Sequence, residues 1–285
     1  MSGVRPSRRY RILIHVAAVF VSLIFLAPFA WMLIASISSQ KELLAVPLDW
    51  IPNHISFDRY KEIFTAHGDN PFANFRASLL NSIIIATSAV AISITVGVFG
   101  AYSLARLRFR AQRPLLLVFL STYMVPPIAL VIPLYLIMVN LHLLDTRLGL
   151  VIVYCTFTTP FVIWIMGNFF RTIPHELEDA ARVDGCSRVG ALFRVILPLS
   201  RPGLLATMLF AFLVAWDEFL YALIFTSTTA AKTVPVAIAE FAGRYTTDFG
   251  LQAAGGILAA LPPVLIALVF QRYIVSGLAS GAVKG

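Results

Sequence analysis

Long apolar runs alternate with short polar segments along the chain. Six of these runs reach the roughly 20 residues that a helix needs to cross a lipid bilayer. With boundaries given to within a few residues, they cover 12–36, 79–104, 115–140, 149–170, 202–225 and 251–273. The pattern predicts an all-α integral membrane protein with six transmembrane helices.

The composition excludes a soluble globular protein. Hydrophobic residues make up 59% of the chain, charged residues 13%, and the mean hydropathy is +0.85. The first apolar run follows several arginines, as in a secretory signal peptide, but it is longer than the roughly 7–15 apolar residues of a signal core. We expect it to remain as the first transmembrane helix.

Basic residues are distributed unevenly between the two sides of the predicted bundle. The N-terminus, the 106–113 loop, the 171–201 segment and the C-terminal tail share one side and hold 15 of the 22 Lys and Arg residues. The loops on the other side hold the remaining seven, together with a comparable number of acidic residues. Because the basic side faces the cytoplasm, both termini and the 171–201 segment are predicted to be cytoplasmic.

The chain carries no recognisable catalytic or metal-binding motif. The net charge of +8 does not indicate nucleic-acid binding, because the basic residues flank the apolar runs instead of gathering on one soluble face. Cys155 lies in an apolar run and Cys186 in a polar loop, which argues against a disulfide framework or a metal site. The phosphate-binding loop G-x-x-x-x-G-K-[ST] is absent, so we expect no ATP hydrolysis and no cofactor in this chain.

Prolines occur in most of the apolar runs. Each removes a backbone donor, which is costly in lipid unless a neighbouring helix satisfies the freed carbonyl. The stretch Met124–Val125–Pro126–Pro127, followed by Pro133, predicts a broken or kinked third helix. Interrupted helices often line the cavity of a transporter, although transmembrane helices also tolerate single prolines without such a role.

A charged turn, ELEDAARVDG at 176–185, separates the fourth and fifth runs. Pro174 and the acidic residues after it are typical of a helix N-terminus, and Gly185 is typical of a left-handed C-cap. Leu177, Ala180, Ala181 and Asp184 share one face of this helix, where the two alanines allow another surface to approach closely. This favours a docking element; the alternative is an amphipathic connector lying on the headgroups. A second short helix is predicted from about 188 to 195, before Pro198.

The turn resembles the EAA loop of inner-membrane permease subunits of ABC importers. That family carries E-A-A, three residues, G, nine residues and I-x-L-P. Here the pattern reads Asp179–Ala180–Ala181, three residues, Gly185, nine residues and Val195–Ile196–Leu197–Pro198 without a gap, with Asp in place of Glu and Val in place of Ile. The resemblance implies that the turn seats in a cleft of a cytoplasmic ATPase. The implied coupling residues are Glu178, Asp179, Ala180, Ala181, Asp184, Gly185, Leu197 and Pro198.

Further motifs are similar to the carbohydrate branch of that family. They are AYSLARLRF (101–109), MVPPIALVIPLY (124–135) and QRYIVSGLASGAVKG (271–285), the last of which looks like the ending of the maltose-type second permease. The resemblance implies one transmembrane domain over 1–285, with a permease core at about 79–273, in a bacterial-type cytoplasmic (inner) membrane. It also implies that the tail Gly281, Ala282, Val283, Lys284 and Gly285 reaches the ATPase.

The same resemblance implies the function and the partners. The chain is expected to be a non-catalytic subunit of an ATP-driven importer that moves a sugar or oligosaccharide by alternating access. Its partners are then a second, non-identical permease, two ATPase subunits that bind ATP and Mg, and an extracytoplasmic solute-binding protein. Two alternatives are the same architecture importing glycerol phosphate, a polyol or a polyamine, and an ion-coupled secondary transporter that uses Asp217 and Glu218.

Two acidic residues lie inside the fifth run, in AFLVAWDEFLYAL (211–223). A charged group within a membrane is costly and usually faces a cavity or a partner. Asp217 and Glu218, with the rings of Trp216 and Phe219, therefore form a candidate sugar contact on the translocation path. In the structural alternative, the acidic pair lies at the outer membrane boundary or bonds a neighbouring helix. Relatives usually carry Asn at position 217.

The 229–250 segment lies on the outer side in this topology. In maltose-type permeases the corresponding loop extends toward the binding protein, which implies a contact through Phe241, Tyr245 and Asp248. The alternative is a simple interfacial helix that the rings of Phe241 and Tyr245 anchor in the headgroup region.

Overall fold

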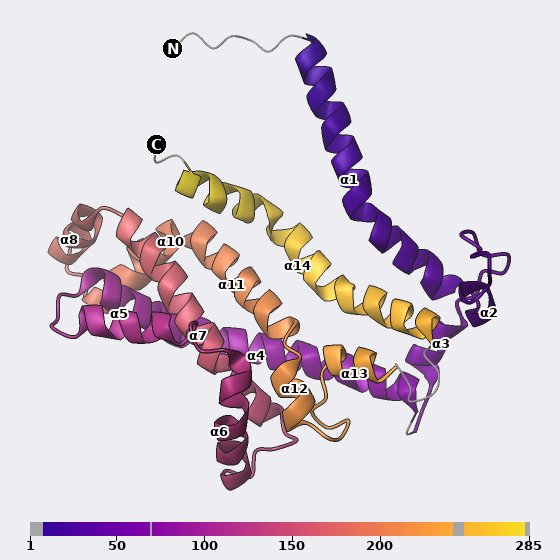
Figure 1. Cartoon of the computed structure of the whole chain (residues 1–285). Helices are drawn as coiled ribbons and strands as arrows, with labels where there is room; N and C mark the ends of the chain where they lie inside the picture. The colour runs from indigo at the N-terminus through magenta and orange to yellow at the C-terminus, as the bar shows by residue number, and fades with distance from the viewer. Residues whose placement is uncertain (1–7, 69, 242–247, 283–285) are drawn as a thin grey trace. The chain divides into compact units, whose positions relative to one another are not determined.

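The chain is helical in a computed structural model, which describes residues 8–68, 70–241 and 248–282 (Figure 1). The described residues form α-helices and a π-helix, and no strand. The longer helices are α1 (Arg8–Ile37), α4 (Pro71–Arg106), α7 (Arg147–Thr172), α11 (Arg201–Trp216) and α14 (Phe249–Ala282). The shorter ones are α2 (Gln40–Leu43), α3 (Asp58–Thr65), α5 (Gln112–Ser121), α6 (Pro127–Asn140), α8 (His175–Val183), α9 (Arg188–Ala191), the π-helix η1 (Leu192–Ile196), α10 (Leu197–Leu199), α12 (Leu220–Phe225) and α13 (Val234–Glu240).

Four of the described helices, α1, α4, α7 and α14, are long and apolar enough to cross a membrane. A fifth candidate is the pair formed by Arg188–Leu199 and α11, which are bent by 82° at a break. The predicted all-helical membrane architecture is therefore confirmed, with four to five apolar candidate spans in the part of the chain that the structure describes.

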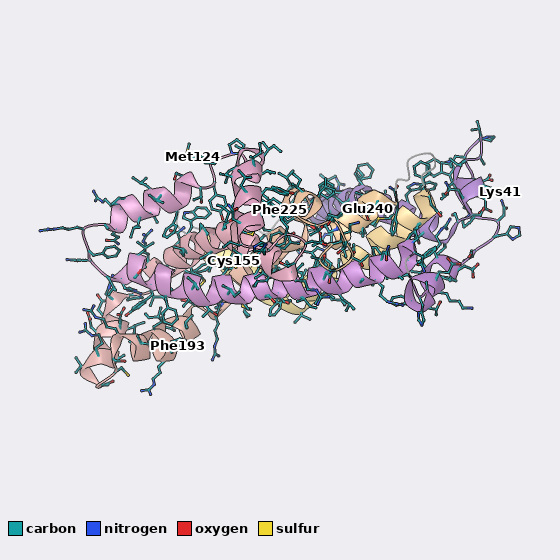
Figure 2. All side chains as sticks on the ribbon, turned by 90° about the horizontal axis from the view of Figure 1, so that it is seen from below. Lys41, Met124, Cys155, Phe193, Phe225 and Glu240 are labelled. Carbon is teal, nitrogen blue, oxygen red and sulfur yellow. The ribbon has the colours of Figure 1, made fainter. Side chains whose placement is uncertain are left out.

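The third apolar run is broken, as its prolines predict. α5 ends and α6 begins on either side of residues 122–126, and Pro126 is the N-cap of α6. Met124, in the connection, is 84% exposed (Figure 2). The hydroxyl of Tyr221 in α12 donates a hydrogen bond to the carbonyl oxygen of Pro127 (3.1 Å), which connects α12 to the start of α6.

The contacts divide the chain into two compact units. Unit 1 comprises residues 1–73 and 238–259, and unit 2 comprises residues 74–237 and 260–285. In unit 1, polar contacts tie α3 to the end of α1. The hydroxyl of Tyr60 donates to Ser36 Oγ (2.7 Å), and Arg59 Nη1 donates to the carbonyl oxygen of Ser38 (2.6 Å).

In unit 2, α4 packs closely against α7 through small residues. Two of the small buried residues of α4, Ser93 and Gly97, contact α7 directly. A Cβ atom on Gly97 would lie 2.5 Å from a methyl group of Val162, and the hydroxyls of Ser93 and Thr158 are hydrogen-bonded at 2.6 Å. In lipid, helices associate through such close packing and interhelical hydrogen bonds, because burial from lipid supplies no hydrophobic gain.

α7 also packs along α11 (Figure 1). A Cβ atom on Gly203 of α11 would lie 2.5 Å from the ring of Phe169, so glycine permits this close approach. The hydroxyl of Thr207 donates to the carbonyl oxygen of Gly203 (2.7 Å) and lies 3.5 Å from Met166 Sδ of α7. α7 is thereby held on both sides, and its C-terminal end leads directly into the charged turn.

Candidate functional site

The charged turn folds into α8 and ends at a glycine, as predicted. Gly185 has φ +89°, a left-handed conformation that a Cβ atom disfavours. The N–H of Gly185 donates to the carbonyl oxygen of Arg182 (3.1 Å), and the N–H of Cys186 donates to that of Ala181 (3.0 Å). These are the two bonds of a Schellman motif, which satisfies carbonyls that a helix end leaves free.

One face of α8, the outer face, is accessible in the subunit. Its exposed or partly exposed residues are Leu177, Ala180, Ala181, Asp184 and Gly185. Beside them, the carboxylate of Asp179 lies 4.0 Å from Arg182 Nη1, and its side chain is 71% exposed. A surface pair of this kind contributes about 0–1 kcal/mol, so Asp179 is free to exchange its partner. The outer face is thus a small apolar surface flanked by charges.

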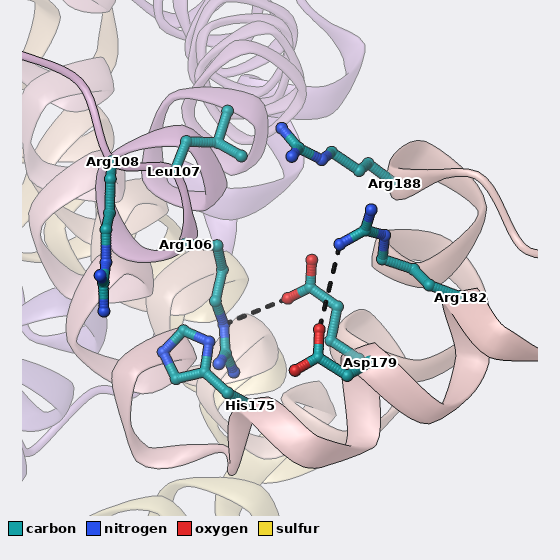
Figure 3. Close-up of a pocket in the computed structure, with 8 residues that line it drawn as sticks. Arg106, Leu107, Arg108, His175, Asp179, Arg182 and Arg188 are labelled. Carbon is teal, nitrogen blue, oxygen red and sulfur yellow. Dashed lines mark ion pairs between the residues drawn. The ribbon is translucent and has the colours of Figure 1, made fainter.

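The opposite face of α8 directs a carboxylate into the subunit. Glu178 is 7% exposed and is the only buried residue of α8. The hydroxyl of Tyr102 donates to Glu178 Oε1 at 2.5 Å. Arg106 Nε lies 3.7 Å from Glu178 Oε2, and this ion pair is drawn as a dashed line in Figure 3. Because these partners draw the carboxylate inward, Glu178 does not share the outer face with the other predicted coupling residues of α8.

Arg106 connects three helices. Its side chain is only 1% exposed, and its Nη2 donates to the carbonyl oxygens of Phe170 (2.7 Å) and Ile173 (2.8 Å) at the end of α7. The last carbonyls of a helix lack partners within it and carry partial negative charge, so a guanidinium stabilises them. A single cation therefore connects the end of α4, the end of α7 and the inner face of α8.

A cavity of about 490 Å³ lies beside this ion pair (Figure 3). Its lining residues are Arg106, Leu107, Arg108, His175, Glu178, Asp179, Arg182 and Arg188. Four guanidinium groups accompany two carboxylates, so the cavity is basic. The lining offers charges and hydrogen-bonding groups from both signs of side chain.

After Gly185 the chain passes through α9, η1 and α10 before it enters α11. Leu192 and Ile196 are buried, whereas Leu197 and Pro198 are partly exposed. The segment that ends in α10 is bent by 82° relative to α11. The Leu-Pro end of the motif therefore forms the corner between the short helices and the fifth apolar run. A helix in this segment was predicted, but its π-helical turn was not.

The fifth apolar run is interrupted at its acidic pair. α11 ends and α12 begins on either side of residues 217–219, so the prediction of one continuous helix over 202–225 is wrong at this point. Glu218 Oε1 accepts a hydrogen bond from the N–H of Tyr221 (2.8 Å), and its Oε2 accepts one from the N–H of Ala222 (3.1 Å). The carboxylate thus caps the first turn of α12, which favours the break.

The four predicted path residues have different surroundings. Trp216 is 3% exposed and its ring stacks on Phe212, with 5.4 Å between centroids. Asp217 and Phe219 are exposed in the subunit, and Glu218 is partly buried as the cap of α12. Of the four, Asp217 and Phe219 are the exposed ones.

A polar cluster near the start of α4 was not predicted. Asn81 is fully buried, and its Nδ2 donates to the carbonyl oxygens of Thr229 (3.0 Å) and Lys232 (2.9 Å). Arg147 Nε donates to Asn81 Oδ1 (2.8 Å). The cluster joins α4, the start of α7 and the segment after α12. An asparagine within an apolar run is the only signal for it in the sequence.

Asp145 holds the same segment from the connection between α6 and α7. It accepts hydrogen bonds from the N–H groups of Ser227 and Thr228 (both 3.0 Å) and from the hydroxyl of Thr228 (2.6 Å). Burial by itself raises the pKa of a carboxyl group, but the bonds from Thr228 and Ser227 outweigh it and lower the pKa of Asp145 below its ordinary value. The carboxylate form therefore stabilises this loop.

The predicted binding-protein contacts are only partly described. Phe241 is 8% exposed. Asp248 Oδ1 lies 3.4 Å from Arg59 Nη2 and accepts a hydrogen bond from the N–H of Leu251 (2.9 Å), so Asp248 caps the start of α14 within unit 1. Tyr245 lies outside the described residues.

The predicted ATPase-contacting tail is described only at its start. Gly281 and Ala282 are the last residues of α14, and Val283, Lys284 and Gly285 lie outside the described residues. The contact of this tail with an ATPase therefore stays a prediction.

Comparison with known proteins identifies the family. Residues 93–280 match the family described as "Binding-protein-dependent transport system inner membrane component". The chain is 36% identical over 276 residues to the trehalose/maltose transport system permease protein MalG of Thermococcus litoralis, covering 96% of this chain and 97% of that protein. It is 43% identical over 237 residues to the trehalose transport system permease protein SugB of Mycobacterium tuberculosis, covering 82% and 84%.

A solved structure has the same fold. It is a chain from a bacterial ABC transporter involved in the import of the acidic polysaccharide alginate, with a TM-score of 0.75 and 25% identity over 95% of this chain and 99% of that chain. The protein is accordingly a multi-pass permease of the inner membrane and a non-catalytic component of transport. This chain belongs to the family of binding-protein-dependent transport system inner membrane components, the permease subunits of ABC importers.

Proposed function

We propose that this chain is the second permease subunit of an ATP-driven importer for a sugar or an oligosaccharide. The relatives MalG and SugB are named for trehalose and maltose, and the similar solved transporter imports a polysaccharide. The observation that carries the transport role is the outer face of α8, an accessible small-residue surface on a helix that is attached to the ends of two spans.

The proposed topology has six crossings with both termini in the cytoplasm. α1, α4, α7 and α14 each cross as a single helix. α5 with α6 and α11 with α12 are proposed to cross as broken pairs, because helices of 10, 14, 16 and 6 residues are shorter than the roughly 20 that a crossing needs. The uneven distribution of Lys and Arg supports a cytoplasmic α8. Residues 1–285 then form one transmembrane domain with a core at about 79–273.

α8 is proposed to seat in a cleft of a cytoplasmic ATPase subunit. Ala180 and Ala181 allow close approach, the exposed carboxylate of Asp179 suits a basic group of the partner, and the corner at Leu197 and Pro198 leads into α11. ATP-driven closure of the ATPase would then favour one arrangement of the spans over the other, which is a shift between two states. ATP and Mg belong to that partner, since this chain lacks a phosphate-binding loop.

The complete transporter is proposed to contain a second, non-identical permease, two ATPase subunits and an extracytoplasmic solute-binding protein. The segment around Phe241, Tyr245 and Asp248 is the proposed contact with the binding protein, and the tail from Gly281 to Gly285 is a second proposed contact with the ATPase. The family description itself names a binding protein, which supports the first of these contacts.

Asp217 and Phe219 are proposed to face the translocation path. Both are exposed in this chain at an interruption of the fifth run, and interrupted helices commonly line transporter cavities. A carboxylate beside an aromatic ring can bind sugar hydroxyls and cover an apolar sugar face. Trp216 and Glu218 are proposed to fix the shape of the interruption through the stacking and capping bonds already described.

The ion-coupled alternative is less well supported. Both oxygens of Glu218 accept backbone hydrogen bonds, so Asp217 would be the only member of the pair available to a coupling ion. The other alternative is an importer of glycerol phosphate, a polyol or a polyamine. It has the same architecture as the proposed sugar importer and differs only in the transported solute.

Reconstitution tests the proposal. The tagged chain should co-purify with a nucleotide-binding subunit, and proteoliposomes that contain the complete transporter should take up labelled trehalose or maltose only with ATP and the binding protein. Uptake driven by an ion gradient in the absence of the ATPase would contradict the importer. ATP-dependent uptake of a polyamine without any uptake of sugars would contradict the substrate class.

A further inference from the structure

We propose that Glu178 is a positioning residue for transport: its contacts with Tyr102 and Arg106 hold α8 on the ends of α4 and α7, so that movement of the outer face passes to both helices. This inference rests on the proposed docking of α8 to an ATPase. It concerns the inner face of α8, to which the proposed docking gives no role.

α8 lacks the apolar anchor that usually holds a short helix to a protein. Glu178 is its only buried side chain, whereas Leu177 and Val183 are 44% and 87% exposed. A nine-residue helix is too short to be stable alone, so its orientation depends on its tertiary contacts. Ile173 and Leu192 are buried before and after α8, but within the helix the inward attachment is the carboxylate.

The two partners of this carboxylate lie on one face of α4. Tyr102 and Arg106 are four residues apart, which is one helical turn. The hydroxyl of Tyr102 donates to Glu178 Oε1 (2.5 Å) and also lies 3.4 Å from the carbonyl oxygen of Arg188 in α9. Arg106 Nε lies 3.7 Å from Glu178 Oε2. α8 and the start of α9 are therefore held at the same point of α4.

Arg106 extends this attachment to α7. Its Nη2 is occupied by the carbonyl oxygens of Phe170 and Ile173, so the guanidinium cannot follow α8 without leaving the end of α7. α7 in turn packs closely on α4 and α11. A displacement of α8 consequently acts on α4 and α7 together, which is what a coupling element requires.

The position of Glu178 depends on these contacts as well as on burial. A cavity of about 490 Å³ has Glu178 and Arg106 in its lining, and their side chains are only 10% and 1% exposed. Removal of one member of a buried ion pair leaves an uncompensated charge, and the remaining partner then favours another arrangement. Loss of the charge at position 178 should therefore loosen the orientation of α8 without removing its outer face.

The test uses the complete transporter in proteoliposomes and measures sugar transported per ATP hydrolysed. Glu178→Gln removes the charge at nearly constant size, and Glu176→Gln, on the exposed part of α8, is the matched control. We expect Glu178→Gln to retain the ATPase subunits and basal hydrolysis but to lower the transport-to-hydrolysis ratio roughly tenfold, within the range typical of coupling between sites. Glu178→Asp, which keeps the charge, should restore part of the ratio, and Glu176→Gln should keep the original value.

Two further variants separate this inference from the proposed docking. Tyr102→Phe removes one hydroxyl and should lower the ratio several-fold, which keeps a test available if Glu178→Gln fails to assemble. Ala180→Trp blocks the outer face and should uncouple transport by itself. If Glu178→Gln and Tyr102→Phe match the control while Ala180→Trp uncouples, the positioning role is wrong and the docking stands. If Ala180→Trp is also without effect, the docking is wrong.

Discussion

Glu178 and Glu218 are glutamates at two interruptions of the apolar pattern, but they are held in different ways. Glu178 accepts a hydrogen bond from the side chain of Tyr102, which is 76 residues away in sequence, and forms an ion pair with Arg106. Glu218 is bonded by backbone N–H groups three and four residues ahead of it. The hydrogen bond from Tyr102 joins separate helices and can pass movement between them, whereas the two backbone hydrogen bonds of Glu218 shape the start of α12, beside Tyr154 of α7. Glu178 is accordingly the residue proposed to act in coupling, and Glu218 the one that shapes the broken span.

The largest effect is expected when the cation is removed from the contact between α4 and α8. Arg106→Met leaves Glu178 buried without a counter-charge and leaves the end of α7 without its donor. We expect a loss of about 3–5 kcal/mol, measured as a lower Tm of the purified subunit in detergent. The double variant Arg106→Met with Glu178→Met should recover much of this loss, because no unpaired charge remains. A double variant less stable than the single one would contradict the pairing.

The C-terminal end of α8 offers a second test, because its backbone depends on glycine and not on the ion pair. Gly185→Val places a β-branched side chain at φ +89°, at a cost of about 1–2 kcal/mol or more. We expect normal membrane insertion but ATP hydrolysis uncoupled from uptake, measured in proteoliposomes. Gly185→Asn, which tolerates this conformation better, is the control. Normal transport by Gly185→Val would count against a docking role for α8.

Removal of the Glu218 cap should destabilise the protein less, and the change should be confined to α12. Glu218→Ala removes both acceptors from the first turn of α12 and should cost about 0.5–2 kcal/mol, as for other helix caps. Glu218→Gln should cost less, because its amide oxygen still accepts. The checking measurement is hydrogen exchange, which should become faster at the amides of Tyr221 and Ala222 and stay unchanged in α8. Faster exchange in α8 would show that the two regions are not separate.

The smallest expected effect is the pH dependence of the loop that Asp145 holds. Its folded-state pKa is lowered below the ordinary value of 3.8, so the folded state binds fewer protons than the unfolded state at acidic pH. The stabilisation is therefore complete above that value and is lost as the pH falls through the lowered pKa. Asp145→Asn should remove this part of the decline in Tm below about pH 4. If the Tm of Asp145→Asn declines at acidic pH as much as that of the original chain, other groups cause the acid sensitivity.

The features that the sequence predicts correctly have causes within a few residues. Apolar runs produced the long helices α1, α4, α7 and α14, and the pair Pro126–Pro127 produced the break in the third run. Gly185 adopts the left-handed conformation expected of a helix end. In each case the local backbone chemistry favours one structure whatever the rest of the chain does.

The features that the sequence pattern does not predict depend on partners that are distant in sequence or on competition for the same backbone amides. The spacing within α8 cannot reveal that Glu178 turns inward, because Tyr102 and Arg106 lie at the far end of another helix. The same holds for buried Asn81, whose partners belong to a loop about 150 residues later. The break at 217–219 arises because Glu218 competes for amides of a helix that its apolar composition alone would continue.

Thiol protection at Ala180 tests most directly whether the outer face of α8 lies in the ATPase. In a chain with Cys155 and Cys186 replaced by alanine, Ala180→Cys is exposed to a membrane-impermeant maleimide applied from the cytoplasmic side. We predict rapid labelling of the isolated subunit and strong protection once the ATPase subunits are bound. Equal labelling rates with and without the ATPase would contradict the proposed docking.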